Sequence, residues 1–174
     1  MKIRVKLNEA GIAELIKALN DYKRVLEECS AKLVERLASE GFQIARAGFA
    51  RAEYDGTNDA NVMIETRDDR LKAIVAVGAS VLFIEFGTGV VYPDIHPEAS
   101  ENGMKRGRYG QGKGAQDTWG YYGDPGTHGE VIKTSSKGQL VLTHGYPANM
   151  PMYQAAKELA DVLPGLVREV FSHD

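Results

Sequence analysis

Residues 9–52 carry the pattern of one very long amphipathic helix. Asn8 is expected to cap its N-terminus, and the apolar residues that follow are spaced alternately by three and four: Ile12, Leu15, Leu19, Tyr22, Leu26, Cys29 and Leu33. Unbroken, this helix would be roughly 66 Å long, whereas a compact chain of this length has a radius of gyration of roughly 16 Å. The helix must therefore bend, break near Asn20–Asp21 or Gly41, or protrude, and a protruding apolar seam requires a partner subunit.

The patterns around this helix predict short strands. Alternating apolar and basic residues predict a strand at residues 2–7, and residues 61–66 and 71–78 read as the two strands of a β-hairpin. The second of these is apolar at nearly every position, so we expect both its faces to be covered, one of them by the long helix. Residues 80–86 form either a strand or two helical turns, and residues 139–143 form a last short strand.

A closing helix is expected from about Pro151, and Pro164–Gly165 should kink or split it. The length of the chain, residues 1–174, fits a single domain with one core.

Residues 90–138 differ in composition from the rest of the chain. Nine of the 27 residues from Gly103 to Gly129 are glycine, so this segment buries too little apolar area to offset its ordering entropy. Aromatic residues nevertheless occur within it, and they are poor choices for a solvated linker: Tyr109, Trp119, Tyr121 and Tyr122. We expect a flexible glycine-rich arm without strands of its own, which becomes ordered against a neighbouring subunit.

Length, charge and cysteine content exclude several classes of protein. The 174 residues carry a net charge of −3, so no overall positive field attracts nucleic acid. The single cysteine, Cys29, allows neither an internal disulfide nor a site of several thiolates, and its place in the helical seam favours a buried, unreactive thiol. No apolar run approaches the ~18 residues of a membrane span. We expect a soluble protein, made in a reducing compartment, without a membrane partner.

No motif of an enzyme stands out. Gly107–Lys113 has the spacing of a phosphate-binding loop, but Gly114 replaces the required Ser or Thr, and the G-x-G-x-x-A match at 110–115 has no strand before it. The four histidines lack the spacing of metal ligands and are expected on surface loops: His96, His128, His144 and His173. We therefore predict no catalytic residue, no metal and no cofactor.

Two charged features remain open. Glu85 is the one acid in an apolar context, and it either faces solvent or is half-buried and paired with an arginine of this chain or an adjacent one. Four basic residues follow one another without an intervening acid: Lys105, Arg106, Arg108 and Lys113. They are either a solvated loop or a contact with DNA phosphate or an acidic neighbour.

Four segments together resemble the tail-component family of long-tailed bacteriophages, the small neck and tail-completion proteins also called minor tail or head-tail joining proteins. They are Phe83-Ile-Glu-Phe-Gly-Thr-Gly89, Tyr109-Gly-Gln-Gly-Lys-Gly114, Thr118-Trp-Gly-Tyr-Tyr-Gly-Asp-Pro-Gly126 and Thr143-His-Gly-Tyr-Pro-Ala-Asn-Met-Pro-Met-Tyr153. The resemblance implies an α+β fold, in which the long N-terminal helix packs on a small antiparallel sheet and is followed by the glycine-rich arm and a C-terminal helix. It also implies a non-enzymatic virion protein that is assembled in the bacterial cytoplasm. It would form a ring between the capsid connector and the tail tube, with neck, connector and tail-tube proteins as neighbours.

In this interpretation the arm contacts other subunits, and the segments 83–89 and 147–153 fix its two ends. The expected contact residues are Phe83, Glu85, Phe86, Gly87, Thr88, Gly89, Tyr109, Trp119, Tyr121, Tyr122, Pro147, Pro151 and Tyr153. An alternative is a nucleic-acid-contacting assembly module that uses the basic loop. A third hypothesis, an enzyme with the arm as a lid, has no catalytic chemistry in the sequence to support it.

Overall fold

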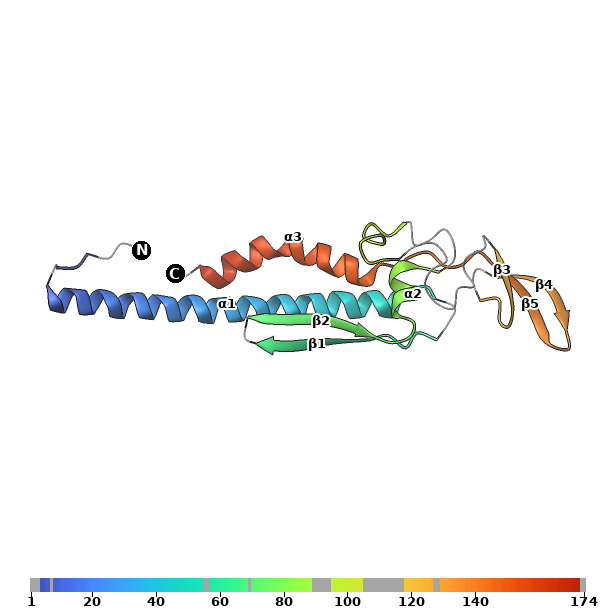
Figure 1. The fold of residues 1–174 in the computed structure, drawn as a ribbon, viewed down its shortest axis with the longest axis horizontal. Helices are drawn as coiled ribbons and strands as arrows, with labels where there is room; N and C mark the ends of the chain where they lie inside the picture. The colour runs from blue at the N-terminus through green and yellow to red at the C-terminus, as the bar shows by residue number, and fades with distance from the viewer. Residues whose placement is uncertain are drawn as a thin grey trace.

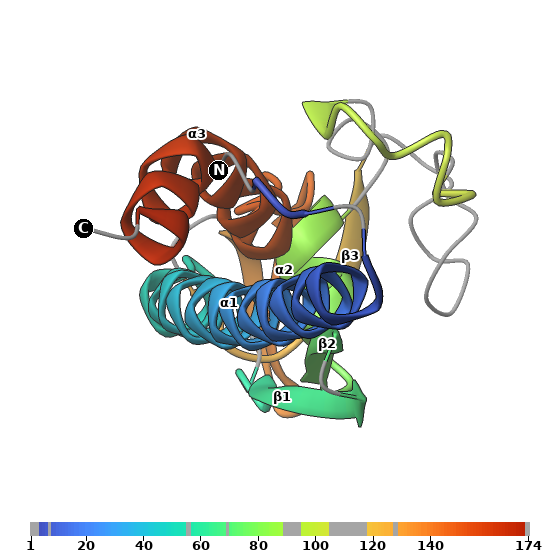
Figure 2. The same ribbon diagram turned by 90° about the vertical axis from the view of Figure 1, so that its left-hand side faces the viewer.

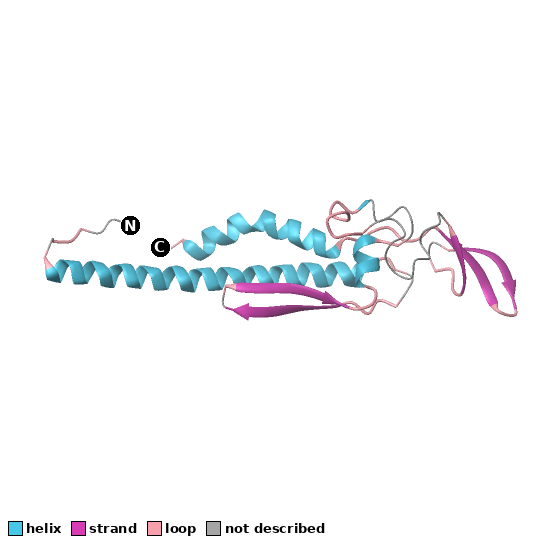
Figure 3. Ribbon diagram, in the orientation of Figure 1, coloured by secondary structure: helices cyan, strands magenta, loops and turns pink. Residues whose placement is uncertain are grey.

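The protein is an elongated α+β molecule built along one helix (Figure 1). The computed structural model describes residues 4–6, 8–54, 57–68, 70–88, 95–104, 118–126 and 129–172. Figure 3 shows its helices gathered along the long axis and its strands in two separate antiparallel sheets. The predicted fold class, with a long N-terminal helix, small antiparallel sheets and a C-terminal helix, is confirmed.

Helix α1 (Glu9–Arg51) runs without a break for 43 residues, about 65 Å. As predicted, Asn8 caps it: the Asn8 Oδ1 atom accepts a 2.9 Å hydrogen bond from the Gly11 amide. Of the three outcomes open to so long a helix, this one protrudes, since its N-terminal half extends well beyond the packed helices and strands (Figure 1). The expected strand at residues 2–7 is absent from residues 4–6, which are irregular because no described strand lies beside them to pair with.

The predicted β-hairpin is present. Strands β1 (Asn61–Asp68) and β2 (Leu71–Val77) pair antiparallel, with Ile64 opposite Ile74. They lie along one side of α1, and α3 covers another side (Figure 2). Two ion pairs fasten the turn end of the hairpin to α1: Arg70 with Glu27, and Lys72 with Glu35. The expectation for β2 was only partly right, because its central residues are half-buried rather than covered on both faces.

Helix α3 (Pro151–Phe171) packs antiparallel against the C-terminal half of α1. Glycines on α1 permit a close approach: a Cβ atom on Gly48 would lie 2.8 Å from the Cβ atom of Pro151. Toward the other end of α3, Arg36 and Glu169 form a 2.6 Å ion pair. Pro164 does not split α3, which continues through it and is bowed in its middle (Figure 1).

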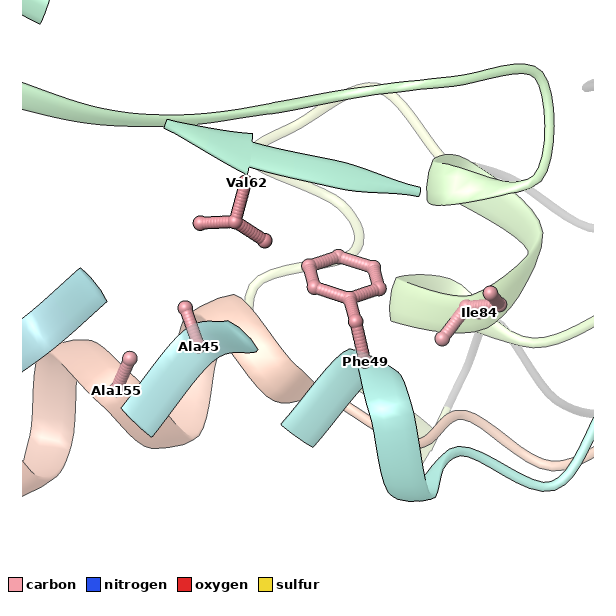
Figure 4. Packing of buried hydrophobic residues seen from close by; sticks show 5 residues of the cluster. All are labelled: Ala45, Phe49, Val62, Ile84 and Ala155. Atoms are coloured by element: carbon pink, nitrogen blue, oxygen red, sulfur yellow. The ribbon is translucent and has the colours of Figure 1, made fainter. Parts of the chain in front are cut away.

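The hydrophobic core lies where α1, α3, β1 and a short helix, α2 (Val81–Phe86), meet. Residues 80–86 are thus the helical alternative of the two that the sequence left open. Side chains from the four elements point into a common centre (Figure 4). These core residues are Ala45, Phe49, Val62, Ile84 and Ala155.

A second sheet lies at the opposite end of the molecule from the free end of α1 (Figure 1). Its strands are β3 (Trp119–Tyr122), β4 (Glu130–Ser135) and β5 (Gly138–Thr143), in the order β3-β5-β4. The expectation that residues 90–138 contain no strands is therefore wrong for β3 and β4. Both pair with β5, the one strand expected here: β4 comes directly before it in a hairpin, whereas β3 pairs with it from a greater distance in the sequence, which leaves little local signal for β3.

Candidate functional site

Two of the motif segments lie against each other, at the junction of α2 and α3. The amide of Asn149 donates to the carbonyl of Ile84 (2.9 Å), and the amide of Thr88 donates to the carbonyl of Tyr146 (2.8 Å). The Tyr146 amide in turn donates to Thr88 Oγ1 (2.8 Å). Backbone hydrogen bonds therefore hold residues 83–88 against residues 146–153, and we call this contact the junction. These two segments flank the part of the chain that includes the glycine-rich stretch.

Glu85 caps α3 from a distance of 67 residues in sequence. Its Oε2 accepts the amide hydrogen of Met152 (2.8 Å), and its Oε1 accepts that of Tyr153 (2.9 Å). Met150, the residue before the helix, has no side-chain capping bond and takes up a left-handed conformation (φ 55°). A carboxylate at this point satisfies free amides and complements the positive end of the helix dipole.

The third partner of Glu85 is His96. The His96 Nε2 atom lies 3.1 Å from Glu85 Oε1, and His96 Nδ1 accepts the amide hydrogen of Glu98 (3.1 Å). Only 6% of Glu85 and 3% of His96 are exposed. Of the alternatives for Glu85, solvent exposure is wrong, and within the described part of the chain Glu85 pairs with a histidine rather than with an arginine. The expectation that the histidines lie on the surface is wrong for His96, whose burial is compensated by the pair with Glu85. His144 is exposed, and His128 and His173 lie outside the described residues.

Aromatic rings enclose this polar pair. The rings of Phe86 and His96 have centroids 4.4 Å apart, and those of His96 and Tyr153 have centroids 5.3 Å apart. A cavity of about 290 Å³ opens beside them, and its lining includes Leu82 and Met152. All the polar atoms of the Glu85 carboxylate already accept bonds from the chain, so the arrangement serves to hold α2, α3 and residues 95–104 together.

The hairpin has its own polar closure, which the sequence analysis did not identify. Asp59, just before β1, accepts hydrogen bonds from the amides of Ala79 (2.9 Å) and Ser80 (2.8 Å), just after β2. The Ser80 hydroxyl also donates to the same carboxylate, and this bond contributes most to lowering the pKa of Asp59 to about 2. The signal was available: an acid before one strand and a serine after its antiparallel partner meet at the same end of a hairpin.

The remaining predicted contact residues that the structure describes lie at this junction and in the second sheet. Phe83, Thr88, Pro147 and Tyr153 are half-buried, and Phe86, Gly87 and Pro151 are buried within the chain. In the second sheet, Trp119 pairs with Thr143, the Tyr121 hydroxyl donates to the carbonyl of Asp124 (2.7 Å), and Tyr122 is 54% exposed. Six predicted residues lie outside the described ones: Gly89, Tyr109, Lys105, Arg106, Arg108 and Lys113.

An apolar stripe lies on the free half of α1. Leu15, which belonged to the predicted seam, is half-buried here. Four other residues of that seam, together with Ile16, are 36–54% exposed: Ile12, Ile16, Leu19, Tyr22 and Leu26. We call these five residues the α1 stripe. Cys29, farther along the helix, is buried as expected. The seam thus changes from exposed to buried where α3 begins to cover α1.

The described residues show neither a metal site nor a membrane span. No group of three or more His, Cys, Asp or Glu side chains in that part of the chain could hold a metal ion. Among the described helices, none is long and apolar enough to cross a bilayer. No protein-family model, curated protein or solved structure matches this chain. The bacteriophage interpretation therefore stays a hypothesis based on the sequence motifs.

Proposed function

We propose that this protein is a structural subunit of long-tailed bacteriophage particles and that it acts without catalysis in tail completion or head-tail joining. In this proposal it assembles into a homo-oligomeric ring at the neck, beside connector and tail-tube proteins. The motif segments from Phe83 to Tyr153 support the family, and the α1 stripe supports the assembly.

The α1 stripe is the observation that carries the proposal. Its five apolar side chains follow one another along a helix that extends past the body of the molecule (Figure 1). Monomeric proteins rarely expose a contiguous apolar stripe to water, because each Å² of apolar surface that is removed from water contributes about 25 cal/mol of favourable free energy. The helix needs no such residues for its own folding, since its other half already holds the core.

Light scattering across a concentration series tests the assembly. We expect the purified protein to increase in mass with concentration and Leu19→Glu to prevent this, because a carboxylate would be buried in the contact. Ala13→Glu is the matched control: it places the same charge on the same exposed stretch of helix, away from the stripe. A wild-type protein that stays monomeric throughout would refute the ring.

The role in the particle is tested by genetics. Removing the gene from a phage genome that carries it should leave filled heads and separate tails under the electron microscope. Wild-type protein supplied in trans should restore joined particles, Ala13→Glu should do the same, and Leu19→Glu should not. Normal particles made without the gene would exclude a function in tail completion or joining.

A further inference from the structure

Helix α3 carries two apolar stripes, and only one of them faces α1. The buried stripe contains Ala155, Leu166 and Val170. A second stripe, displaced around the helix, recurs at spacings of four, three and four residues and is exposed along its length, with Leu163 39% and Val167 37% exposed. We call it the α3 stripe, and its members are Ala156, Ala160, Leu163 and Val167.

The α1 and α3 stripes are both apolar and are similar in length. The α1 stripe from Ile12 to Leu26 extends for about 21 Å, and the α3 stripe from Ala156 to Val167 for about 17 Å. Large side chains dominate the first stripe, whereas the second begins with two alanines, so ridges on one helix meet shallow positions on the other. The large side chains of the α1 stripe and the small ones of the α3 stripe are therefore complementary in shape.

The same row of α1 that forms the exposed stripe already binds an α3 helix farther along. The seam continues from Leu26 through Leu33 to the region around Gly41 and Gly48, where Leu159 and Pro151 of the same chain approach the helix. The free half of α1 therefore extends an existing α1–α3 interface rather than presenting an unrelated surface. Within one chain the contact stops because α3 ends at Phe171, opposite the middle of α1 (Figure 1).

We propose that the α1 stripe of one copy packs against the α3 stripe of a second copy. This inference rests on the proposed oligomeric function and names its contact. Because each copy presents one stripe of each kind, the contact is heterologous, and each added copy leaves a free stripe at both ends until the assembly closes. A symmetric pairing of two α1 stripes would instead stop at two copies and leave both α3 stripes in water.

Cysteine cross-linking tests the contact in the full-length chain with Cys29→Ala, so that no native thiol interferes. Leu19→Cys and Leu163→Cys are placed near the middle of each stripe, so they meet whichever way the helices run. Mixed in equal amounts under mild oxidation, the two variants should form a covalent dimer roughly tenfold faster than either alone, because contact raises their effective concentration. The double variant should form a ladder of higher species.

The control mixture is Ala13→Cys with Lys157→Cys, two exposed positions on the same helices outside the stripes. If light scattering shows oligomers but the stripe mixture cross-links no faster than this control, the inference is wrong and the proposed assembly stands. Rapid cross-linking of Leu19→Cys with itself would overturn the inference in favour of paired α1 helices. If no oligomer forms at any concentration, the proposed assembly fails as well.

Discussion

Glu85 and His96 form a buried pair in which each member also satisfies the backbone of another segment. Glu85 accepts the amides of Met152 and Tyr153, and His96 Nδ1 accepts the amide of Glu98. A ring nitrogen that accepts a bond carries no proton, so His96 is the neutral tautomer whose Nε2–H donates to Glu85. The pair therefore joins α2, α3 and residues 95–104 through four hydrogen bonds.

Removing the Glu85 carboxylate should destabilise the whole fold. We expect Glu85→Ala to lower the free energy of unfolding by about 3 kcal/mol, because two amides of α3 and the His96 N–H lose their acceptor in a buried place. Urea denaturation followed by circular dichroism measures this change. Glu101→Ala, an exposed acid on the 95–104 segment, is the control and should change stability by less than about 0.5 kcal/mol. Equal effects of the two substitutions would contradict the capping role.

The sequence allowed α1 and the hairpin to be predicted because their signals are local. A period of 3–4 residues and a capping Asn8 define α1, and two apolar runs around a polar turn define β1 and β2. The start of α3 at Pro151 was also correct. Its cap was not predictable, because Met150 cannot supply one and Glu85 is 67 residues away.

The second sheet escaped prediction for a different physical reason. Strand β3 contains Gly120 and lies in a glycine-rich stretch, so its composition argues against a strand, and only its pairing with β5 stabilises it. The opposite error, a strand predicted where none forms, occurred at residues 4–6. The alternating pattern at residues 2–7 makes a strand possible, but it does not supply a neighbouring strand to pair with. His96 was misplaced because its environment includes α3, which is distant in sequence, as well as Phe86 and Glu85 of α2.

Two glycine-to-alanine substitutions should have effects of opposite sign. Alanine normally stabilises a helix by about 1 kcal/mol relative to glycine. At Gly48 its methyl group would meet the ring of Pro151, which cannot rotate away, so we expect Gly48→Ala to destabilise the protein by about 1–3 kcal/mol. At Gly165 on α3 no atom lies within 4 Å of the new methyl group, and we expect a gain of about 0.5–1 kcal/mol. Thermal melts measure both shifts, and a higher melting temperature for Gly48→Ala would contradict close packing of α3 on α1 at Gly48.

The Asp59–Ser80 closure should make the hairpin sensitive to acid. Hydrogen bonds from Ser80 and Ala79 lower the pKa of Asp59 from its ordinary value of 3.8 to about 2 in the folded chain. The unfolded chain therefore binds this proton at a higher pH, so the stabilisation by Asp59 is fully present above about pH 4 and is lost as the pH falls toward about 2. The difference in unfolding free energy between wild type and Asp59→Asn should shrink over that interval.

Asp161→Asn is the matched control for this pH series, because Asp161 is an exposed acid on α3 away from the hairpin. Its difference from wild type should stay nearly constant over the pH range in which the Asp59→Asn difference shrinks. A difference for Asp59→Asn that does not change with pH would mean that the hydrogen bonds to Ser80 and Ala79 contribute nothing to stability.

The second sheet should unfold separately from the body of the molecule. Val141, on β5, is fully buried, whereas every residue of β4 from Glu130 to Thr134 is exposed, so this sheet depends on very few buried side chains. We expect Val141→Ala, at a cost of about 2 kcal/mol, to open the sheet locally while the α1–α3 core stays folded. Limited proteolysis with mass spectrometry should show faster cleavage within residues 118–143 and unchanged protection of α1 and α3. Val131→Ala, an exposed valine on β4 at 40% exposure, should leave the cleavage rate unchanged. If Val141→Ala exposed α1 and α3 to cleavage at the same rate as the sheet, the two parts would unfold as one cooperative unit.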